Sequence, residues 1–320
     1  MRYVIGIDGG GSKTEAVAVD LKGRLLKRSR TGSININIVG LKETEKNFNH
    51  IINEIRQEEK ASICIIGTAG IETKRNREFF KKLCRKNKFS EKIKLYSDAT
   101  IAYEAAPKDH RNIIIIGGTG SIAIGTNKKG EKIRCGGWGY LLGDEGSGFW
   151  IGLKTIKEAL KEYDKGEKRS KLTERLLKHF KIKTPPQLVE MIYNRKIDIN
   201  KIAKITEIVT EAEKEGDEKA HIILEMAGEE LANLAKILIT RLKITEPKIH
   251  CFGGIFKSTE TILKTMRKMI RKEYPKGEVN KSSIRPVAGA VILGLKELQV
   301  KIDKEIIENM KIWSRERGYG

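Results

Sequence analysis

Residues 1–20 read MRYVIGIDGGGSKTEAVAVD, and this stretch decides the fold. Residues 3–8 are an apolar run that predicts a buried strand ending at Asp8, and residues 15–20 alternate as a second strand does. Three consecutive glycines join the two. Because glycine has no Cβ, the backbone N–H groups of such a turn can converge on an anion. The stretch predicts a phosphate-binding hairpin, although by itself it also fits a plain glycine-rich turn.

The residues around this turn are of the types that bind a nucleoside triphosphate and its metal ion. Backbone groups, two hydroxyls and one ammonium group are available from Gly10, Gly11, Ser12, Lys13 and Thr14. Asp8 stands at the carboxyl end of the predicted strand, where its carboxylate could hold Mg²⁺ directly or through water. We therefore expect ATP and Mg²⁺ as cofactors, with Asp8 as the metal-binding residue.

Two better-known phosphate loops do not fit this hairpin. A P-loop would have the spacing of Gly6 and Gly11, but it needs lysine where Ser12 stands and it opens a helix. A dinucleotide-binding loop also leads into a helix, whereas residues 15–20 alternate like a strand. The sequence therefore excludes both of these loop classes.

The strand–glycine turn–strand pattern occurs a second time. Residues 112–116 and 122–126 are apolar strands, and GGTGS lies between them. Gly118, Thr119 and Gly120 are the phosphate-binding candidates of this second hairpin, and Ser121 is a substrate-binding candidate. Two such hairpins on two lobes could grip a polyphosphate, and a pair is much harder to explain as ordinary turns.

The repeat predicts two α/β lobes. Residues 1–111 read as a three-strand meander followed by helix, strand, helix and strand, which describes one α/β lobe. Residues 112–298 are expected to form the second lobe, mostly helical between 152 and 242, and 299–320 a C-terminal helix that could pack back on the first. One unit duplicated at this separation indicates a duplicated domain rather than a solenoid.

Two further segments end at strands and carry candidate site residues. Gly253 and Gly254 follow the predicted strand 248–252, where an adenosine could lie flat on the backbone next to a helix N-terminus. A simple strand cap is an alternative for this pair. Asp98 in Ser-Asp-Ala ends the predicted strand 92–97 and suits a general base for a sugar hydroxyl. Asp98 could instead be a helix N-cap.

Residues 135–152, CGGWGYLLGDEGSGFWIG, are poor material for a core because they combine dense glycine with two tryptophans and an acidic pair. Such a composition suits a loop that closes on a polar ligand. Asp144 could accept hydrogen bonds from hydroxyl groups, and Trp138 could cover the apolar face of a sugar. Trp150 is expected to pack in the helix that follows.

These motifs together resemble the N-acetylglucosamine kinase family. They are DGGGSKT, GSIN, SDA, GTGS, GGWGYLLGDEGS and the late GG, and the twelve-residue GGWGYLLGDEGS is the most specific of them. The family is of the BadF/BadG/BcrA/BcrD type within the actin-like sugar kinase superfamily, and the resemblance runs from residue 2 to about residue 298. It implies a two-lobed, actin-like ATPase fold of the ribonuclease H-like type, with lobes that close over ATP.

The resemblance also implies roles for single residues. It makes Asp98 the catalytic base and Asn35 a sugar-binding residue. Further sugar contacts are implied for Gly137, Trp138 and Asp144, phosphate contacts for Ser12 and Thr119, and an adenosine contact for Gly254. The second hairpin departs from the family pattern at Gly117, where relatives often have alanine or serine. No functional residue is assigned within residues 157–246.

The net charge of +21, from 63 basic and 42 acidic residues, raises the question of nucleic acid. The basic residues are scattered and usually stand beside glutamate, which is typical of a solvated, thermophile-like surface, and no nucleic-acid-binding motif accompanies them. No apolar run reaches the roughly 18 residues of a membrane span. The isolated cysteines and the lack of a leader pattern favour a cytoplasmic protein without zinc or iron–sulfur ligands.

The sequence thus predicts ATP-dependent phosphorylation of a hexose or amino sugar at its primary 6-hydroxyl. N-acetylglucosamine, glucosamine and glucose all remain open as the substrate. The alternative is an ATPase that activates a 2-hydroxyacyl-CoA dehydratase or a benzoyl-CoA reductase, which the isolated cysteines disfavour. The partner is expected to be a small sugar rather than nucleic acid or membrane. The helical second lobe could supply a homodimer surface.

Overall fold

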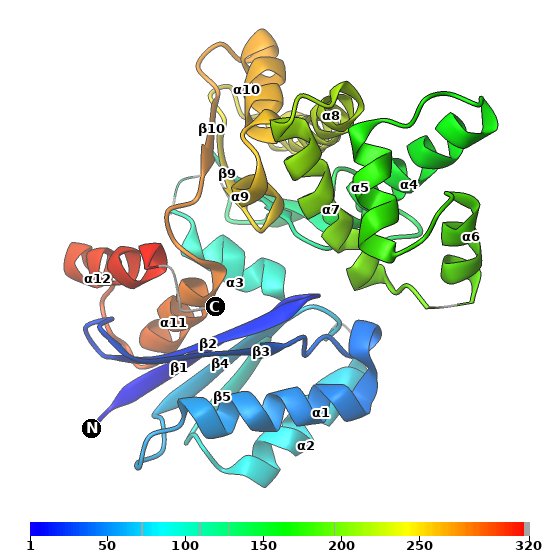
Figure 1. Cartoon of the computed structure of the whole chain (residues 1–320). Coiled ribbons are helices and arrows are strands. Elements are labelled where there is room, and N and C mark those ends of the chain that lie inside the picture. Colours follow the sequence, from blue (N-terminus) through cyan, green and yellow to red (C-terminus); the bar gives the residue numbers. More distant parts are fainter. Residues whose placement is uncertain (72, 108, 110, 128, 195, 317–320) are drawn as a thin grey trace. The chain divides into compact units, whose positions relative to one another are not determined.

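The computed structural model describes residues 1–71, 73–107, 109, 111–127, 129–194 and 196–316 (Figure 1). The chain divides into two compact units. The first combines Met1–Lys108 with Ser282–Gly320, and the second is Asp109–Lys281. Each unit contains one five-stranded sheet and is described by itself.

The sheet of the first unit has the order β3-β2-β1-β4-β5. Its strands are β1 (Tyr3–Gly9), β2 (Lys13–Asp20), β3 (Leu25–Gly32), β4 (Ile63–Thr68) and β5 (Ile93–Tyr96). The first three strands form the predicted antiparallel meander, and β4 and β5 add in parallel to β1. The glycine turn after Asp8 therefore lies at the carboxyl end of the central strand.

Helices cover both faces of this sheet. They are α1 (Ile36–Ile55), α2 (Lys74–Asn87), α3 (Asp98–Ala105), α11 (Pro286–Glu297) and α12 (Lys304–Arg315). Side chains alternate along a strand, so even and odd positions of β2 enter different cores. Its even positions pack with α1 and α2, and its odd positions pack with α3, α11 and α12.

The division of the chain differs from the predicted ranges at one place. Residues 282–298, which the sequence analysis assigned to the second lobe, pack in the first unit. A side chain at Gly289 would bring its Cβ to 1.7 Å from the carbonyl oxygen of Ile101, so glycine lets α11 lie directly against α3. Trp313 of α12 is buried in the same unit, where its indole N–H donates to the carbonyl of Gly23 at 3.1 Å. No linker-like composition marks this return, and residues 282–298 follow directly from the second unit.

The second unit repeats the topology of the first. Its sheet has the order β10-β9-β6-β7-β8, with β6 (Asn112–Gly117), β7 (Ser121–Thr126), β8 (Lys132–Gly136), β9 (Lys248–Phe252) and β10 (Glu278–Lys281). Again an antiparallel meander is extended in parallel from its first strand. The predicted α/β fold with a duplicated strand–glycine hairpin–strand core is confirmed.

The long segment between β8 and β9 is helical, as predicted. The helices of the second unit are α4 (Gly148–Asp164), α5 (Lys171–Phe180), α6 (Pro186–Tyr193), α7 (Ile199–Lys214), α8 (Glu218–Leu242), α9 (Ile255–Ser258) and α10 (Thr261–Glu273). The helical segment after β9 is interrupted. An extended Thr259, whose hydroxyl accepts a hydrogen bond from the N–H of Thr261 at 3.1 Å, separates the single turn α9 from α10.

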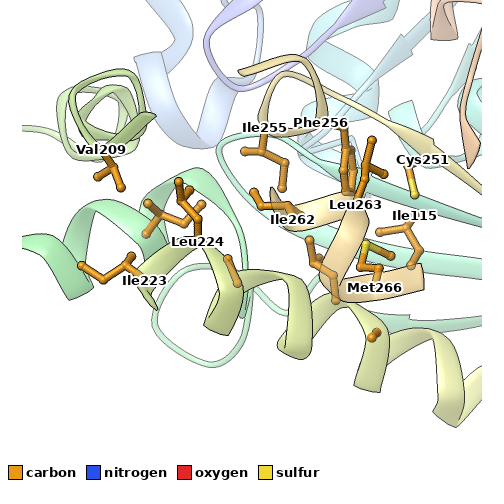
Figure 2. Close-up of a cluster of buried hydrophobic side chains, with 14 of the residues drawn as sticks. Ile115, Val209, Ile223, Leu224, Cys251, Ile255, Phe256, Ile262, Leu263 and Met266 are labelled. Carbon is orange, nitrogen blue, oxygen red and sulfur yellow. The ribbon is translucent and has the colours of Figure 1, made fainter. Parts of the chain in front are cut away.

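The core of the second unit is continuous from sheet to helices. Figure 2 shows Ile115 of β6 and Cys251 of β9 beside Leu263 and Met266 of α10. All four side chains are almost fully buried. Among the described residues, no helix combines the length and apolarity that a membrane crossing requires.

Candidate active site

The first glycine hairpin is held from both sides by hydroxyl groups. The N–H of Gly10 donates to the carbonyl of Lys13 at 3.0 Å and closes the turn. The hydroxyl of Ser33 donates to the carbonyl of Gly10 at 2.8 Å, and that of Thr68 to the carbonyl of Gly9 at 3.0 Å. Both hydroxyl groups bind carbonyls of the loop, so these two hydrogen bonds fix it without occupying its N–H donors.

The predicted phosphate contacts divide into an accessible part and a buried part. Gly10 and Gly11 are partly exposed, and Ser12 and Lys13 are exposed. Thr14 is fully buried, and among the described residues its hydroxyl has no hydrogen-bond partner. The alternation of β2 turns Thr14 toward the α1 and α2 side of the sheet. The structure therefore places its hydroxyl in the interior rather than on the rim of the hairpin.

Asp8 lies in a strongly negative environment. Burial first, and then the carboxylates of Asp98 and Glu15, raise the pKa of its carboxyl group to about 8, while Lys13 opposes this shift. A divalent cation would replace the missing positive charge, and Mg²⁺ commonly binds one or two carboxylates together with phosphate oxygens and water. The donors present therefore fit a magnesium ion that is shared with a bound phosphate.

Asp98 is the first residue of α3, and it is not the cap of that helix. Ser97 is the N-cap, and its hydroxyl accepts a hydrogen bond from the N–H of Thr100 at 3.2 Å. The carboxylate of Asp98 accepts the N–H of Ala99 at 2.7 Å and is only partly buried. The alternative interpretation of Asp98 as an N-cap is therefore wrong. The helix N-terminus favours its charged form, the form in which a carboxylate accepts a proton.

Glu15 was not predicted as a site residue, although it contributes to the field at Asp8. Its carboxylate pairs with Arg285 at 2.8 Å, Arg30 at 3.3 Å and Arg28 at 3.6 Å. The exposed fraction of the Glu15 side chain is only 12%. The one available signal was a charged residue inside the alternating strand EAVAVD. The pairing with Arg285, which comes from the distant C-terminal segment, could not be read from local pattern.

Asn35 caps α1 and lies in a cluster of amide side chains. Its side-chain oxygen accepts the N–H of Asn37 at 3.1 Å, and the residue is 7% exposed. Asn76 donates to the side-chain oxygen of Asn37 at 3.3 Å and also to the carbonyl of Gly70. A Cβ at Gly70 would lie 2.6 Å from the side-chain oxygen of Asn35. Asn37 and Asn76 were missed because only the folded loops bring them to Asn35.

The second hairpin is tied to the beginning of α4. The N–H of Gly118 donates to the carbonyl of Gly120 at 2.9 Å. The carbonyls of Gly118 and Thr119 accept hydrogen bonds from Gly148 at 2.8 Å and Phe149 at 3.1 Å. The first N–H groups of a helix have no partner within the helix, so this contact satisfies two of them and fixes the hairpin.

Asp144 and Ser121 support the second hairpin from inside. The carboxylate of Asp144, which is 9% exposed, accepts the N–H of Ser121 at 3.2 Å and would lie 2.6 Å from a Cβ at Gly120. Burial raises the pKa of the Asp144 carboxyl, and the hydrogen bond from Ser121 opposes this. The hydroxyl of Ser121 donates to the carbonyl of Glu145 at 2.7 Å. Both side chains, predicted as sugar contacts, thus have partners within the unit.

Trp138 is the exposed part of the predicted sugar loop. Its ring is 63% exposed, and the guanidinium of Arg134 lies 4.1 Å from the ring centroid. Gly137 has a φ of 70°, and a Cβ there would lie 2.8 Å from the side chain of Ile122. Gly137 is thus required by the backbone, and Trp138 remains accessible to a ligand.

Gly253 and Gly254 are glycines for different reasons. Gly253 has a φ of 114°, and a Cβ there would lie 2.0 Å from the carbonyl oxygen of Gly117. A Cβ at Gly254 would meet nothing within 4 Å. Packing therefore explains the first glycine, whereas the second faces space that a flat ligand could occupy. The helix that follows is only the single turn α9, so it offers a weaker N-terminus than expected.

The structure thus brings some predicted site residues together within each unit. In the first unit the carboxylate of Asp98 raises the pKa of Asp8, and in the second the carboxylate of Asp144 accepts the N–H of Ser121 beside Gly120. The carbonyl oxygen of Gly117, at the start of the second hairpin, is also the closest neighbour of Gly253.

Comparison with known proteins identifies the family. The model of the BadF/BadG/BcrA/BcrD ATPase family matches residues 5–294. An N-acetylmuramic acid/N-acetylglucosamine kinase from Clostridium acetobutylicum is 35% identical over 305 residues, which are 93% of this chain and 99% of the relative. An N-acetyl-D-glucosamine kinase from Dictyostelium discoideum is 30% identical over 312 residues, 91% of this chain and 97% of the relative.

Solved structures show the same fold. One solved as a candidate N-acetylglucosamine kinase from Chromobacterium violaceum has a TM-score of 0.74 at 22% identity and covers 92% of this chain and 99% of its own. A glucokinase of the ROK family from Streptomyces griseus, solved with glucose and AMPPNP, has a TM-score of 0.63 at 17% identity. The match covers 92% of this chain and 98% of the glucokinase chain. The predicted actin-like fold is confirmed, and the chain belongs to the BadF/BadG/BcrA/BcrD ATPase family as an enzyme of the sugar kinase class.

Proposed function

We propose that the protein transfers the γ-phosphoryl group of ATP to the primary 6-hydroxyl of an amino sugar or hexose. N-acetylglucosamine is the first choice of acceptor, because the two relatives at 30% and 35% identity are named as kinases of that sugar. The observation that carries the proposal is the coupling of Asp8 with Asp98, one carboxylate suited to a metal ion and one at a helix N-terminus.

Asp98 is proposed as the general base. Asp98 stands in the first turn of α3, where the helix N-terminus favours a negative charge, and a carboxylate offers the acceptor oxygens that a sugar hydroxyl needs. Proton removal as the phosphoryl group arrives is the role of a carboxylate in phosphoryl transfer to an alcohol.

The nucleotide would be held mainly by backbone groups. Gly11 and Ser12 of the first hairpin and Thr119 of the second are proposed to donate to phosphate oxygens. The N–H groups of Gly10 and Gly118 close the two turns, so these glycines are proposed to let the phosphates approach the backbone. Lys13 adds a charge, and Gly254 offers an open backbone surface to the adenosine. When bound, Mg²⁺ would neutralise charge on the triphosphate, and Asp8 is the residue proposed to hold it.

Single residues are proposed as sugar contacts. Asn35 is proposed as a hydrogen-bonding residue, since its side-chain nitrogen has no hydrogen bond within the described residues while its oxygen caps α1. Trp138 is proposed to stack on the sugar ring because it is largely exposed. Gly137, Ser121 and Asp144 are proposed to shape the loop behind it.

The test is a substrate panel. ADP release would be measured with N-acetylglucosamine, N-acetylmuramic acid, glucosamine, glucose and N-acetylmannosamine, and the site of phosphorylation would be assigned by NMR. A sugar 6-phosphate as product is expected. ADP release that does not depend on any sugar would refute the proposal and favour the activator function. Against that function, Cys64, Cys84 and Cys251 are buried, so that only Cys135, which is partly exposed, could approach a cluster at a subunit surface.

We also propose a cytoplasmic homodimer whose surface comes from the helices of the second unit. α6 leaves the side chain of Tyr193 83% exposed, and Val189 on the same helix is 37% exposed. Sedimentation of the protein should give twice the mass of one chain. The Tyr193→Glu variant should sediment with the mass of a single chain.

A further inference from the structure

An open groove runs along one edge of the first unit, between α2 and the edge strand β5. Its volume is about 670 Å³. One wall is a single face of α2, because Arg77, Lys81 and Arg85 recur at intervals of four, and Lys88 follows as the C-cap of this helix. The other wall is the chain from Ser90 through β5. The α2 and β5 labels in Figure 1 mark these elements.

The groove has a large excess of positive charge. Six basic side chains line it, and Glu91 is the one carboxylate among its described lining residues. Lys81 and Lys94 are paired with Glu78 at 2.7 Å and Glu297 at 2.6 Å. The other four basic residues have no carboxylate within 4 Å in the described parts of the chain; they are Lys60, Arg77, Arg85 and Lys88. Four cations that are not paired with a carboxylate would favour an anionic ligand.

The strand wall also offers free backbone groups. β5 pairs with β4 on one side, and it ends the sheet on the other. The carbonyl of Lys92 accepts the N–H of Cys64, which turns alternate residues of this segment toward β4. In a parallel pair the residues between them, Ile93 and Leu95, then direct their N–H and C=O groups to the open edge. Such an edge is a template for an added strand.

The residue that would normally protect this edge is turned away from it. Lysine on an edge strand hinders pairing with another chain. Lys94 holds this place in β5, but its ammonium group pairs with Glu297 of α11. Ile93 and Leu95 pack toward the opposite face, with the core under α1 and α2. The groove therefore combines a free strand edge, a flanking helix and unneutralised cations.

We propose that this groove binds an acidic peptide segment in extended conformation, which adds as a strand to β5 and lies beneath α2. Backbone hydrogen bonds to Ile93 and Leu95 would supply affinity, and carboxylates of the peptide would pair with Arg77, Arg85 and Lys88. The proposal concerns a surface separate from the hairpin residues and does not depend on the phosphoryl-transfer proposal.

A single-stranded nucleic acid is the other anion of suitable length. Proteins that bind it without sequence preference stack its bases on exposed aromatic rings. Tyr96 is the one aromatic side chain among the described lining residues, and it packs in the core formed with α3 and α11. The walls instead supply the N–H and C=O groups of a strand edge together with guanidinium groups. These groups can bind the backbone and the carboxylates of a peptide.

The experiment measures binding of labelled probes to the full chain by fluorescence anisotropy. The first probe is an alternating peptide of glutamate and valine, and the second is the same peptide with its valine nitrogens methylated. Methylation keeps every charge but removes backbone donors, so its affinity should fall about tenfold or more. The third probe is an oligothymidylate of equal charge, which should bind more weakly than the first.

Matched variants locate the site. Arg77→Glu with Arg85→Glu should weaken binding of the first probe by about tenfold or more, since both charges line the groove. Arg75→Glu with Lys82→Glu makes the same charge change on exposed positions of α2 outside the lining, and should change affinity by less than about twofold. Hydrogen exchange at Ile93 and Leu95 should slow when the peptide is bound.

Three outcomes would overturn the proposal. One is no measurable binding of the unmodified peptide. Another is equal affinity for the methylated peptide or for oligothymidylate, which would reveal a general electrostatic surface. The last is equal weakening by both variant pairs. Thermal unfolding of each variant separates lost binding from lost fold, because all four substituted side chains are exposed on α2.

Discussion

The carboxylate of Asp98, at the beginning of α3, raises the pKa of the carboxyl group of Asp8, at the end of β1. The two residues are far apart in sequence but belong to the same unit. Two neighbouring carboxylates that repel each other are suited to different tasks. One can be neutralised by a cation, while the other remains available as a base.

Replacing Asp98 should remove turnover and spare nucleotide binding. Asp98→Asn keeps the side-chain shape at the start of α3 but removes the proton acceptor. We expect kcat to fall by about two orders of magnitude or more, with the dissociation constant for ATP changed by less than about threefold. Steady-state kinetics and calorimetry would measure the two values. If turnover survives the change, Asp98 is not the base.

Asp8 makes the protein without metal less stable as pH rises. Its pKa is about 8 in the folded state, above the ordinary value of 3.8 in the unfolded chain, so the folded state binds more protons between these values. The free energy of unfolding therefore falls as pH rises through this window. Asp8→Asn should remove that dependence and should stabilise the metal-free protein at pH 9 by about 1–2 kcal/mol.

Thermal melts from pH 5 to pH 9 in the presence of a chelator would measure how the stability of the original protein and of Asp8→Asn depends on pH. Asp20→Asn is the control, because Asp20 lies at the far end of β2. Magnesium with ATP should raise the melting temperature of the original protein but not that of Asp8→Asn. An identical pH dependence in both proteins would contradict the assignment of the raised pKa to Asp8.

Much of the fold was predictable because its signals are local. Strand alternation and glycine turns gave the two hairpins, and their repetition gave the duplicated core. The return of α11 to the first unit was not predictable, since it depends on the fit of Gly289 against Ile101 across a long sequence separation. For the same reason the sequence did not reveal Arg285 beside Glu15, or the buried place of Thr14.

Glu15 is expected to be a structural counter-charge for three arginines. Glu15→Gln would remove the carboxylate that pairs with Arg28, Arg30 and Arg285, and we expect a loss of about 2–3 kcal/mol in the free energy of unfolding. Chemical denaturation would measure it. Glu43→Gln, at an exposed pair with Lys46, should cost less than about 0.5 kcal/mol. Equal effects of the two changes would refute a special role for the cluster.

The two adjacent glycines after β9 allow a sharper test, because the same substitution should have opposite consequences. In Gly253→Ala the alanine would have to adopt the positive φ of 114° that glycine has at this position. Its Cβ would also lie 2.0 Å from the carbonyl oxygen of Gly117. The strand end must shift, and we expect a destabilisation of about 2 kcal/mol or more. Gly254→Ala meets no atom within 4 Å, so its stability should change by less than about 0.5 kcal/mol.

Ligand binding should separate the two variants in the other direction. If Gly254 supports the adenosine, the added methyl group of Gly254→Ala occupies space that the ligand needs, and KM for ATP should rise by about fivefold or more while kcat for the sugar changes little. GTP and ATP would be compared as donors, since a contact with the base distinguishes them whereas a contact with the phosphates does not. An unchanged KM for ATP in a stable Gly254→Ala protein would remove Gly254 from the nucleotide site and leave the glycine pair as a strand cap.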